Sequence, residues 1–442
     1  MKKNLIVLFL TGWLFTSAQA QKPAYEMMVD GVKVIVQPSG NEIVEVQTVL
    51  KGGVQNYPAD KTGIESLAMS ALTECGTKND DKNSFKNKLD KVSAQVYGYT
   101  GKDYAVFRMN CIKSDFNTVW PLYVDALTQP RFDEKEFARV KQDAINNLKA
   151  QNSQPDAAIN KFAEQVAFAG RDYAKDPMGT VESLQSFTAA ATKAYYQSIL
   201  TRSRMVIVVV ADLDKAEIEN KVKAMLAGVK PGAPFTLKKS SFRIYKNTFT
   251  VTPKELATNY IEGITSGPQP GTPDFNAFQV AMRIFYDKHF LDVRTNNGLS
   301  YAPGAYFSGG ATSSARFVVS TTQPDAYIKV LDQLIERIKK EGFNADEVKD
   351  MKTTFLTSFY YKQETNSAQA SSIAANEVLH DNWKRSLTLA DDVKKLTPDE
   401  VNTAFRRYVG NISWVYQGDP KKVDQILYIN GTIKRPDNPV NH

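Results

Sequence analysis

The three histidines of this chain are the side chains best suited to hold a catalytic metal, and their spacing excludes a common zinc site. They are His289, His380 and His442. A zinc-hydrolase helix of the form H-x-x-E-H holds its metal with two histidines four residues apart, and the glutamate between them activates a metal-bound water. No two histidines lie that close here, so the sequence cannot form this motif at any position.

Carboxylates do not supply a substitute site. Glu65, Glu74 and Asp143 lie in the same part of the sequence, but carboxylates alone favour hard cations such as calcium or magnesium. We expect all three on solvated helix faces. His289 is expected on a helix and half-buried, and His380 at a helix end, where a positive charge suits the helix dipole. The sequence therefore predicts no metal and no other cofactor in this chain.

The N-terminus has the three parts of a secretory signal peptide. Lys2 and Lys3 give a positive start, residues 5–15 are mostly apolar, and Ala18-Gln19-Ala20 is a small-x-small cleavage site. An apolar run this short does not span a bilayer core of about 30 Å. A short membrane anchor is the alternative. We expect cleavage after Ala20 and a mature chain, without a transmembrane segment, in the periplasm.

The two cysteines, Cys75 and Cys111, allow two interpretations in an exported protein. They could form a disulfide, although two cysteines do not make a disulfide scaffold. They could also remain buried thiols, which behave as small apolar side chains. We favour buried thiols, and the pairing stays open.

Composition predicts a globular protein of two or more domains. Hydrophobic residues make up 42% and charged residues 23% of the chain. About 420 mature residues are too many for one ordinary core. Without Lys2 and Lys3 the chain has 53 basic and 48 acidic residues, a net charge of +5. These charges are dispersed, which argues against a nucleic-acid partner.

Strand-like runs alternate with amphipathic helical stretches, which predicts an α+β fold. Residues 205–210 form a short continuous apolar run, typical of a buried strand. The other expected strands are 32–37, 44–51 and two runs within 95–110, and the expected helices are 62–75, 115–128, 133–151, 156–169 and 188–200.

The second half repeats the order of elements of the first. Phe132 before one long helix matches Phe343 before another, at an offset of 211, and strands ending at Asp212 and Asp419 match at 207. A nearly constant offset indicates a duplicated unit of about 210 residues, although two unrelated α+β halves would also look alike. A Gly-, Pro- and Lys-rich stretch separates the copies. The predicted organisation is a signal peptide at 1–20, an N-terminal half at 21–228, a linker at 229–241 and a C-terminal half at 242–442.

These landmarks resemble the pitrilysin or insulinase type of zinc peptidase over nearly the whole chain. The matching stretches are Gly63-Ile64 opening a helix that ends at Gly76-Thr77, Gln129-Pro130-Arg131-Phe132 before the long helix, and Arg294 through Tyr301. The resemblance implies two duplicated halves in a clamshell arrangement, each of two α+β units with a mostly antiparallel sheet covered by helices. It also implies a zinc site formed by H-x-x-E-H and a glutamate of the long helix downstream.

The positions of that implied zinc site carry no ligand. Counting from Gly63 places the motif on Ser66, Met69 and Ser70, and the downstream glutamate falls on Asn147. The helix is one residue longer than in the family. Counting back from Gly76 therefore gives Leu67, Ser70 and Ala71 instead. Neither register supplies a histidine or the catalytic glutamate, so the zinc site is degenerate in both.

The resemblance gives Arg294 and Tyr301 a role in catalysis. In active relatives an arginine and a tyrosine, seven residues apart, reach the substrate from the second half. A guanidinium and a phenol can stabilise the negative charge that develops on a peptide carbonyl. We expect Gly298 to turn the chain from helix into strand, with Tyr301 at the strand start. An arginine at a helix end and a tyrosine in a strand also occur for structural reasons alone.

In some family members one chain carries the zinc motif and a related chain carries the Arg/Tyr pair. The resemblance therefore implies a zinc-bearing homologous partner and a peptide substrate, with Arg294 and Tyr301 acting in trans. The alternative is a structural or peptide-binding chain without catalysis. An autonomous peptidase with unusual metal ligation is a third reading, and the histidine count argues against it.

Overall fold

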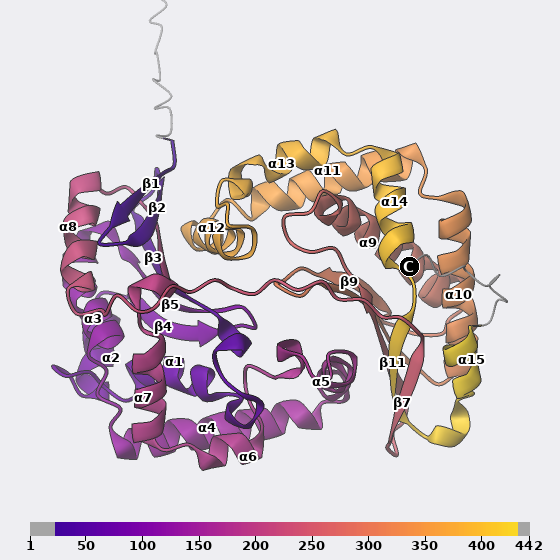
Figure 1. Cartoon of the computed structure of the whole chain (residues 1–442), viewed down its shortest axis with the longest axis horizontal. Helices are drawn as coiled ribbons and strands as arrows, with labels where there is room; N and C mark the ends of the chain where they lie inside the picture. The colour runs from indigo at the N-terminus through magenta and orange to yellow at the C-terminus, as the bar shows by residue number, and fades with distance from the viewer. Residues whose placement is uncertain (1–22, 432–442) are drawn as a thin grey trace, which may run out of the picture.

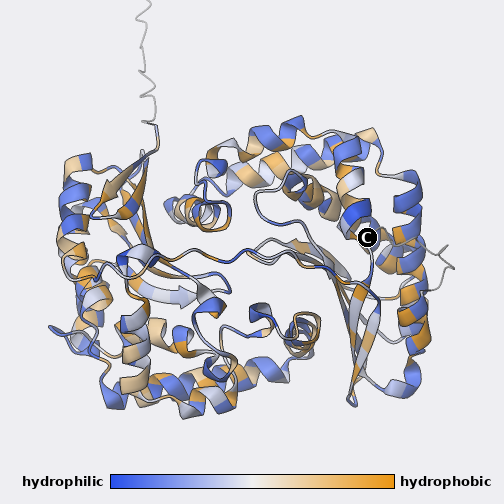
Figure 2. Cartoon of the chain, in the orientation of Figure 1, coloured by the Kyte–Doolittle hydropathy of each residue, from blue (hydrophilic) through white to orange (hydrophobic). Residues whose placement is uncertain are grey.

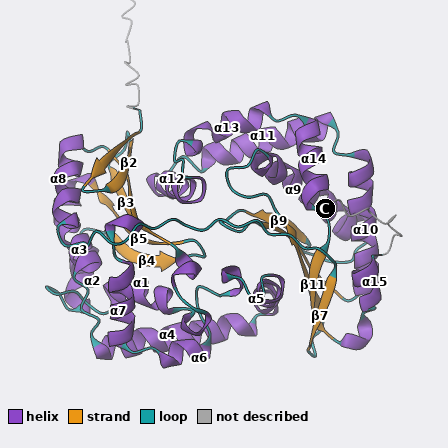
Figure 3. Cartoon of the chain, viewed as in Figure 1, coloured by secondary structure: helices purple, strands orange, loops and turns teal. Residues whose placement is uncertain are grey.

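The computed structural model describes residues 23–431, so the expected signal peptide at 1–20 lies outside the described residues. Elements of the N-terminal half alternate between strand and helix as the sequence predicts (Figure 3). Its strands are β1 (Tyr25–Val29), β2 (Val32–Pro38), β3 (Ile43–Lys51), β4 (Gln95–Thr100), β5 (Tyr104–Ile112) and β6 (Met205–Ala211). Its helices are α1 (Ile64–Glu74), α2 (Lys82–Asp90), α3 (Phe116–Thr128), α4 (Glu134–Ser153), α5 (Pro155–Ala167), α6 (Val181–Ser186), α7 (Ala189–Ile199) and α8 (Lys215–Leu226).

The C-terminal half has the same alternation. Its strands are β7 (Thr248–Pro253), β8 (Asn259–Ser266), β9 (Gly304–Ser308), β10 (Ser314–Thr321) and β11 (Ile412–Gly418). Its helices are α9 (Asp274–Phe290), α10 (Pro324–Glu341), α11 (Ala345–Tyr361), α12 (Asn366–His380), α13 (Arg385–Lys395), α14 (Pro398–Tyr408) and α15 (Gln425–Asn430). Residues 229–241 between the halves contain no helix or strand.

The two sheets have corresponding strand orders, apart from the additional edge strand β1 of the first. The first runs β1-β2-β6-β3-β5-β4, and the second runs β7-β11-β8-β10-β9. Each has one parallel pair, β2 with β6 and β7 with β11, and its other pairs are antiparallel. The predicted α+β fold of duplicated halves, each with a mostly antiparallel sheet covered by helices, is confirmed. The described residues hold one sheet in each half.

Burial follows the residue pattern of each element. The seven residues of β6, Met-Val-Ile-Val-Val-Val-Ala, are all buried, as expected of a central strand. The helices carry both hydrophilic and hydrophobic residues along their length, and several of them cover the outer faces of the two sheets (Figure 2). Within residues 23–431, no helix combines the length and the apolar composition needed to cross a bilayer.

One helix of each half packs on the sheet of the other. Helix α5 of the N-terminal half packs on β8 and β11, whereas α12 of the C-terminal half packs on β3 and β6. Both helices lie in the space between the two sheets (Figure 1). Helix α5 follows α4 just as α12 follows α11, so the two halves exchange equivalent helices. The two halves are therefore joined by packing as well as by the linker.

A buried ion pair lies beneath each exchanged helix. Arg108 of β5 contacts Glu45 of β3, with 2.7 Å between Nη2 and Oε2. Arg316 of β10 contacts Glu262 of β8 at the corresponding place, with 3.0 Å between Nη1 and Oε1. Both glutamates are fully buried. Arg316 also contacts Glu164 of α5, so this pair extends across the junction of the halves.

Candidate functional site

Helix α1 begins at a glycine that no other residue could replace without strain. Gly63 has φ of +88°, and a Cβ built on it would lie 2.7 Å from Cα of Gly179. This close approach fixes where α1 starts against the loop that follows α5. The helix turns Leu67, Ala68 and Ala71 into the core, which leaves one narrow face for any functional side chain.

The degenerate zinc positions lie partly on that face. Ser66 and Ser70 are partly exposed, whereas Met69 is buried against Gly98 of the edge strand β4. Ser66 Oγ lies 3.5 Å from Sδ of Met178. Met178 and Asn147 of α4 line one hollow of about 510 Å³. The structure thus places Ser66 and Asn147 beside the same methionine, although they are 81 residues apart in the sequence.

This donor set does not fit zinc. Two hydroxyls, a thioether and an amide stand where imidazoles and a carboxylate would be needed. Over residues 23–431, no group of three or more histidine, cysteine, aspartate or glutamate side chains is arranged to hold a metal ion. The zinc chemistry that the resemblance implies therefore has no ligands in this half.

Rebuilding the ligands tests which register is correct. The triple variant Ser66→His, Ser70→His, Asn147→Glu is expected to bind one zinc per chain, because these positions reach the surface of α1 and α4. The matched control carries Leu67→His, Ala71→His and Asn147→Glu. It is expected to bind no zinc and to lose stability, since Leu67 and Ala71 are buried. Zinc content after dialysis is the measurement, and zinc in the control alone would establish the other register.

Glu65 was predicted to lie on a solvated helix face, and this prediction is wrong. It is fully buried and accepts hydrogen bonds from Asn56 Nδ2 at 2.9 Å, Thr100 Oγ1 at 3.0 Å and Tyr195 OH at 2.5 Å. Burial raises the pKa of its carboxyl, and the hydrogen bonds partly oppose that rise. Arg204 does not touch Glu65 directly but donates to Asn56 Oδ1 at 2.6 Å. Glu65 therefore ties α1 to β4 and α7 through their polar side chains.

The remaining carboxylates and the cysteines that the sequence analysis considered have structural roles. Glu74 is half-buried and contacts Lys86 at 2.5 Å and Arg139 at 2.7 Å, and Asp143 is exposed. Both cysteines are free and buried, which confirms the favoured interpretation. Burial raises the pKa of each thiol to about 12, so Cys75 and Cys111 are not reactive thiolates at neutral pH.

The two described histidines differ from expectation in burial and charge. His289 is completely buried rather than half-buried, with Nε2 3.3 Å from Tyr327 OH, and burial lowers its pKa to about 3. His380 does end α12, but burial lowers its pKa to about 4. It is therefore neutral at physiological pH, and the predicted favourable charge at the helix end is wrong.

Arg294 and Tyr301 lie together at the end of α9. The helix widens into the π-helical segment η6 (Leu291–Asn296), a form often found at functional sites. Gly298 has φ of +60° and reverses the chain. The Arg294 guanidinium then lies 4.0 Å from the Tyr301 ring centre and 5.0 Å from that of Phe290. Tyr301 lies in the loop before β9, not at the strand start as predicted, because β9 begins at Gly304.

The donors of this pair are free. Tyr301 is 79% exposed. Among the described residues, neither the Arg294 guanidinium nor the Tyr301 hydroxyl has a hydrogen-bond partner. The pair belongs to the C-terminal half, whereas Ser66, Met69, Ser70 and Asn147 belong to the other half. The candidate residues thus form two groups on different elements.

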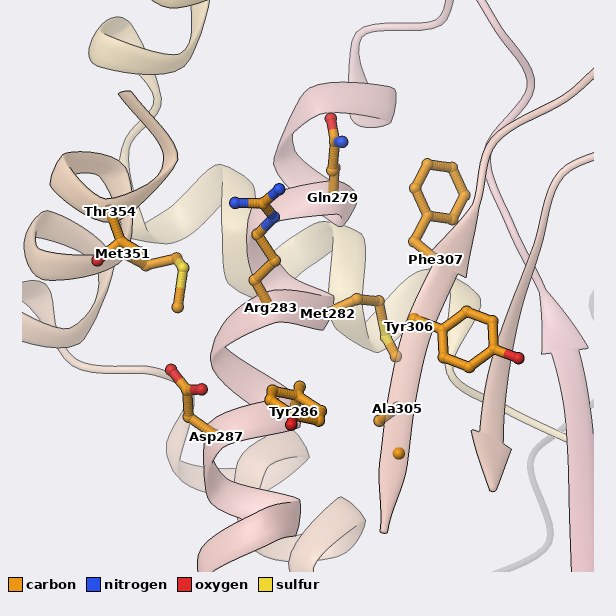
Figure 4. Close-up of a pocket in the computed structure, with 11 residues that line it drawn as sticks. Gln279, Met282, Arg283, Tyr286, Asp287, Ala305, Tyr306, Phe307, Met351 and Thr354 are labelled. Carbon is orange, nitrogen blue, oxygen red and sulfur yellow. The ribbon is translucent and has the colours of Figure 1, made fainter. Parts of the chain in front are cut away.

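A groove at the C-terminal half is a feature that the sequence analysis missed. It lies between α9, β9 and α11, has a volume of about 470 Å³, and is lined by residues such as Met282, Arg283 and Tyr306 (Figure 4). An arginine and an aspartate four residues apart, Arg283 and Asp287, were a signal for it. That spacing alone favours an intrahelical ion pair, but Arg283 and Asp287 do not form one with each other.

Two models of one peptidase family match the chain in succession. The model described as insulinase (peptidase family M16) matches residues 33–181, and the one described as peptidase M16 inactive domain matches residues 186–355. The uncharacterized zinc protease YmxG of Bacillus subtilis (strain 168) is 20% identical over 339 residues, covering 75% of this chain and 82% of its own. The non-peptidase homolog YmxG of Helicobacter pylori (strain ATCC 700392 / 26695) is 20% identical over 444 residues, which cover 96% of this chain and 100% of its own.

Solved structures share the fold. The peptidase M16 inactive domain from Pseudomonas fluorescens superposes with a TM-score of 0.80 at 16% identity, covering 90% of this chain and 98% of its own. The periplasmic protease PqqL from Escherichia coli gives a TM-score of 0.76 at 15% identity, covering 94% of this chain and 49% of its own. The architecture is therefore shared with a solved structure described as a peptidase M16 inactive domain and with one named a protease.

Proposed function

The chain belongs to the insulinase-type peptidase family M16 and is a homologue without zinc ligands, and from this we propose that it is the non-zinc subunit of a heteromeric metallopeptidase. In this proposal Arg294 and Tyr301 complete the active site of a homologous partner chain that holds the zinc. The observation that carries it is the Arg294–Tyr301 pair. Both donors are free and held against one another at the surface, in a chain whose zinc positions carry no ligand.

The geometry supports a role in stabilising charge. A peptide carbonyl that is attacked by water develops negative charge on its oxygen. A guanidinium can donate to that oxygen or hold the neighbouring backbone, and the Tyr301 hydroxyl is a second donor. Stacking on Tyr301 and Phe290 limits the rotamers of Arg294. Less conformational entropy is then lost when the guanidinium binds substrate.

Location and domain movement are part of the same proposal. We propose export to the periplasm with cleavage after Ala20, which the periplasmic neighbour PqqL supports only by analogy. The halves at 21–228 and 242–442 would close over peptide like a clamshell about the linker at 229–241. The exchanged helices α5 and α12 must then move with the sheets that they cover.

A second candidate function is an inert structural or peptide-binding homologue. The Helicobacter pylori relative is named a non-peptidase homolog. The edge strand β4 also has an open side with Tyr97 and Tyr99 exposed at 39% and 41%. An extended peptide can pair with such an edge. This function predicts that no zinc-bearing partner is needed.

Affinity purification of the chain from its own cells separates the two. The heteromeric peptidase predicts recovery of a homologous chain with H-x-x-E-H, and peptidase activity that requires both chains. Mass spectrometry and activity assays of each chain alone and of the mixture are the measurements. Recovery of a zinc-free monomer or homodimer without such a chain would exclude the proposal and favour the inert homologue.

A further inference from the structure

The groove between α9, β9 and α11 is formed by the counterparts of the elements around the degenerate zinc site. In the order of elements, α9, β9 and α11 correspond to α1, β4 and α4. Helix α9 packs on β9 and α11, as α1 packs on β4 and α4. The side chains of the groove differ from those of a metal site, because its lining contains no histidine and a single carboxylate, Asp287.

Arg283 stands in this groove without an anionic partner. Its guanidinium lies 4.8 Å from the ring centre of Phe355 on α11. No carboxylate among residues 23–431 lies within 4.0 Å of it, whereas Arg139, Arg316 and Arg337 each have at least one that close. Burial lowers the pKa of Arg283, which reflects the loss of solvent around an unpaired charge. A half-buried guanidinium of this kind is stabilised by any carboxylate that enters the groove.

The rest of the lining combines apolar side chains with the polar Gln279 and Thr354 and the carboxylate of Asp287. Met282 and Met351 line the groove and are buried, whereas the ring of Tyr306 on β9 points away from Arg283 (Figure 4) and its hydroxyl accepts a hydrogen bond from Asn160 at 3.3 Å. Asp287 lies one turn along α9 from Arg283, on the same side of the helix (Figure 4). Burial raises the pKa of Asp287. The groove thus offers one positive charge, the carboxylate of Asp287 as a charged hydrogen-bond acceptor, and apolar surface from its methionines.

We propose that this groove binds the C-terminal end of a short peptide whose last residue is apolar. The terminal carboxylate accepts hydrogen bonds from Arg283, a backbone N–H donates to Asp287, and the last side chain packs on Met282 and Met351. A planar carboxylate matches the two-pronged guanidinium. Asp287 disfavours ligands with several negative charges, such as phosphates, by repulsion. A volume of about 470 Å³ is within the usual range for sites of small ligands.

Calorimetric titration of the purified chain with acetyl-Leu-Phe as the free acid tests the site. The C-terminal amide of the same peptide is the matched ligand without the charge, and it is expected to bind at least about tenfold more weakly. Arg283→Met keeps an unbranched, flexible apolar stem and removes the guanidinium with its charge. It is expected to weaken binding of the acid to the level of the amide, while Arg283→Lys retains part of the affinity. Thermal unfolding of both variants checks that they fold.

Three results would overturn the assignment. Equal affinity for acid and amide would exclude the carboxylate contact. Unchanged binding by a folded Arg283→Met variant would place the ligand elsewhere. Decanoate, which has no N–H to donate to Asp287, is expected to bind more weakly than the peptide acid, and equal affinity would assign the groove to fatty carboxylates. The site is tested on the isolated chain, so its failure leaves the heteromeric peptidase untouched.

Discussion

Replacing Arg316 by methionine is expected to lower the free energy of unfolding by about 3–5 kcal/mol, because it leaves a buried carboxylate without its partner. Arg316 is 5% exposed, and Glu262, on β8 of the second sheet beneath the exchanged helix α5, is fully buried. Arg316 bonds Glu262 Oε1, and Glu262 Oε2 has no hydrogen-bond partner among the described residues. Urea unfolding followed by circular dichroism measures the loss, which should include earlier separation of the two halves.

The loss should depend on pH in a defined direction. Burial raises the pKa of Glu262 to about 7, while Arg316 opposes that rise. The pKa of Glu262 is higher in the folded than in the unfolded chain. Its contribution to the free energy of unfolding is therefore fully present below a pH of about 4.5 and is lost as the pH rises through about 7. Without Arg316 the folded pKa rises further. The Arg316→Met variant should therefore be more destabilised at pH 8 than at pH 5.5.

The duplicated fold supplies a matched control. Arg108→Met removes the corresponding arginine of the first sheet, but Glu45 keeps hydrogen bonds from Gln47 Nε2 at 3.0 Å and Asn110 Nδ2 at 2.9 Å. A smaller loss of about 1–3 kcal/mol is expected there. Adding Glu262→Gln to Arg316→Met should restore part of the stability, since the uncompensated charge is removed. A loss below about 1 kcal/mol for Arg316→Met, equal at both pH values, would contradict this account.

The second large effect concerns catalysis by the proposed complex. Arg294→Ala and Tyr301→Phe are each expected to lower kcat of the assembled peptidase by about 10²–10³-fold, the usual effect of losing one donor to a developing oxyanion. The Tyr301→Phe variant retains the ring on which Arg294 stacks, so it isolates the hydroxyl. Kinetics of the purified complex are the measurement.

Position and chemistry can be separated with a third variant. Phe290→Leu removes one of the two rings that flank Arg294 and leaves both donors in place. Phe290→Leu should lower kcat less than Arg294→Ala or Tyr301→Phe does. If Arg294→Ala and Tyr301→Phe leave kcat and KM unchanged in an intact complex, the pair has only a structural role and the inert homologue is favoured.

Strand positions could be predicted because each depends on residues within the strand. The apolar run at 205–210 and the run at 44–51 became β6 and β3 with ends shifted by one residue. The duplication was also readable, since α4 and α11 begin 211 residues apart, and β6 and β11 begin 207 apart. Helix α2 was missed because its nine residues include three lysines and have no clear apolar period.

Burial of single charges could not be predicted, because it depends on partners far away in the sequence. Glu65 is buried because Asn56, Thr100 and Tyr195 supply donors from three other elements. The sequence places it on a helix among other polar residues and gives no sign of those donors. Likewise, the apolar faces of α5 and α12 indicate that each covers a sheet, but not that each covers the sheet of the other half.

That exchange of helices has a consequence for how the chain is made. The inner face of the first sheet is covered by α12, whose residues 366–380 leave the ribosome when most of the chain has been synthesised. Until then Glu45 and Gln47 on that face lack the cover of α12, including the 3.2 Å hydrogen bond between Gln47 Nε2 and Ser371 Oγ. A nascent N-terminal half therefore exposes an incomplete face until α12 has emerged. Its final packing is a late step shared with the other half.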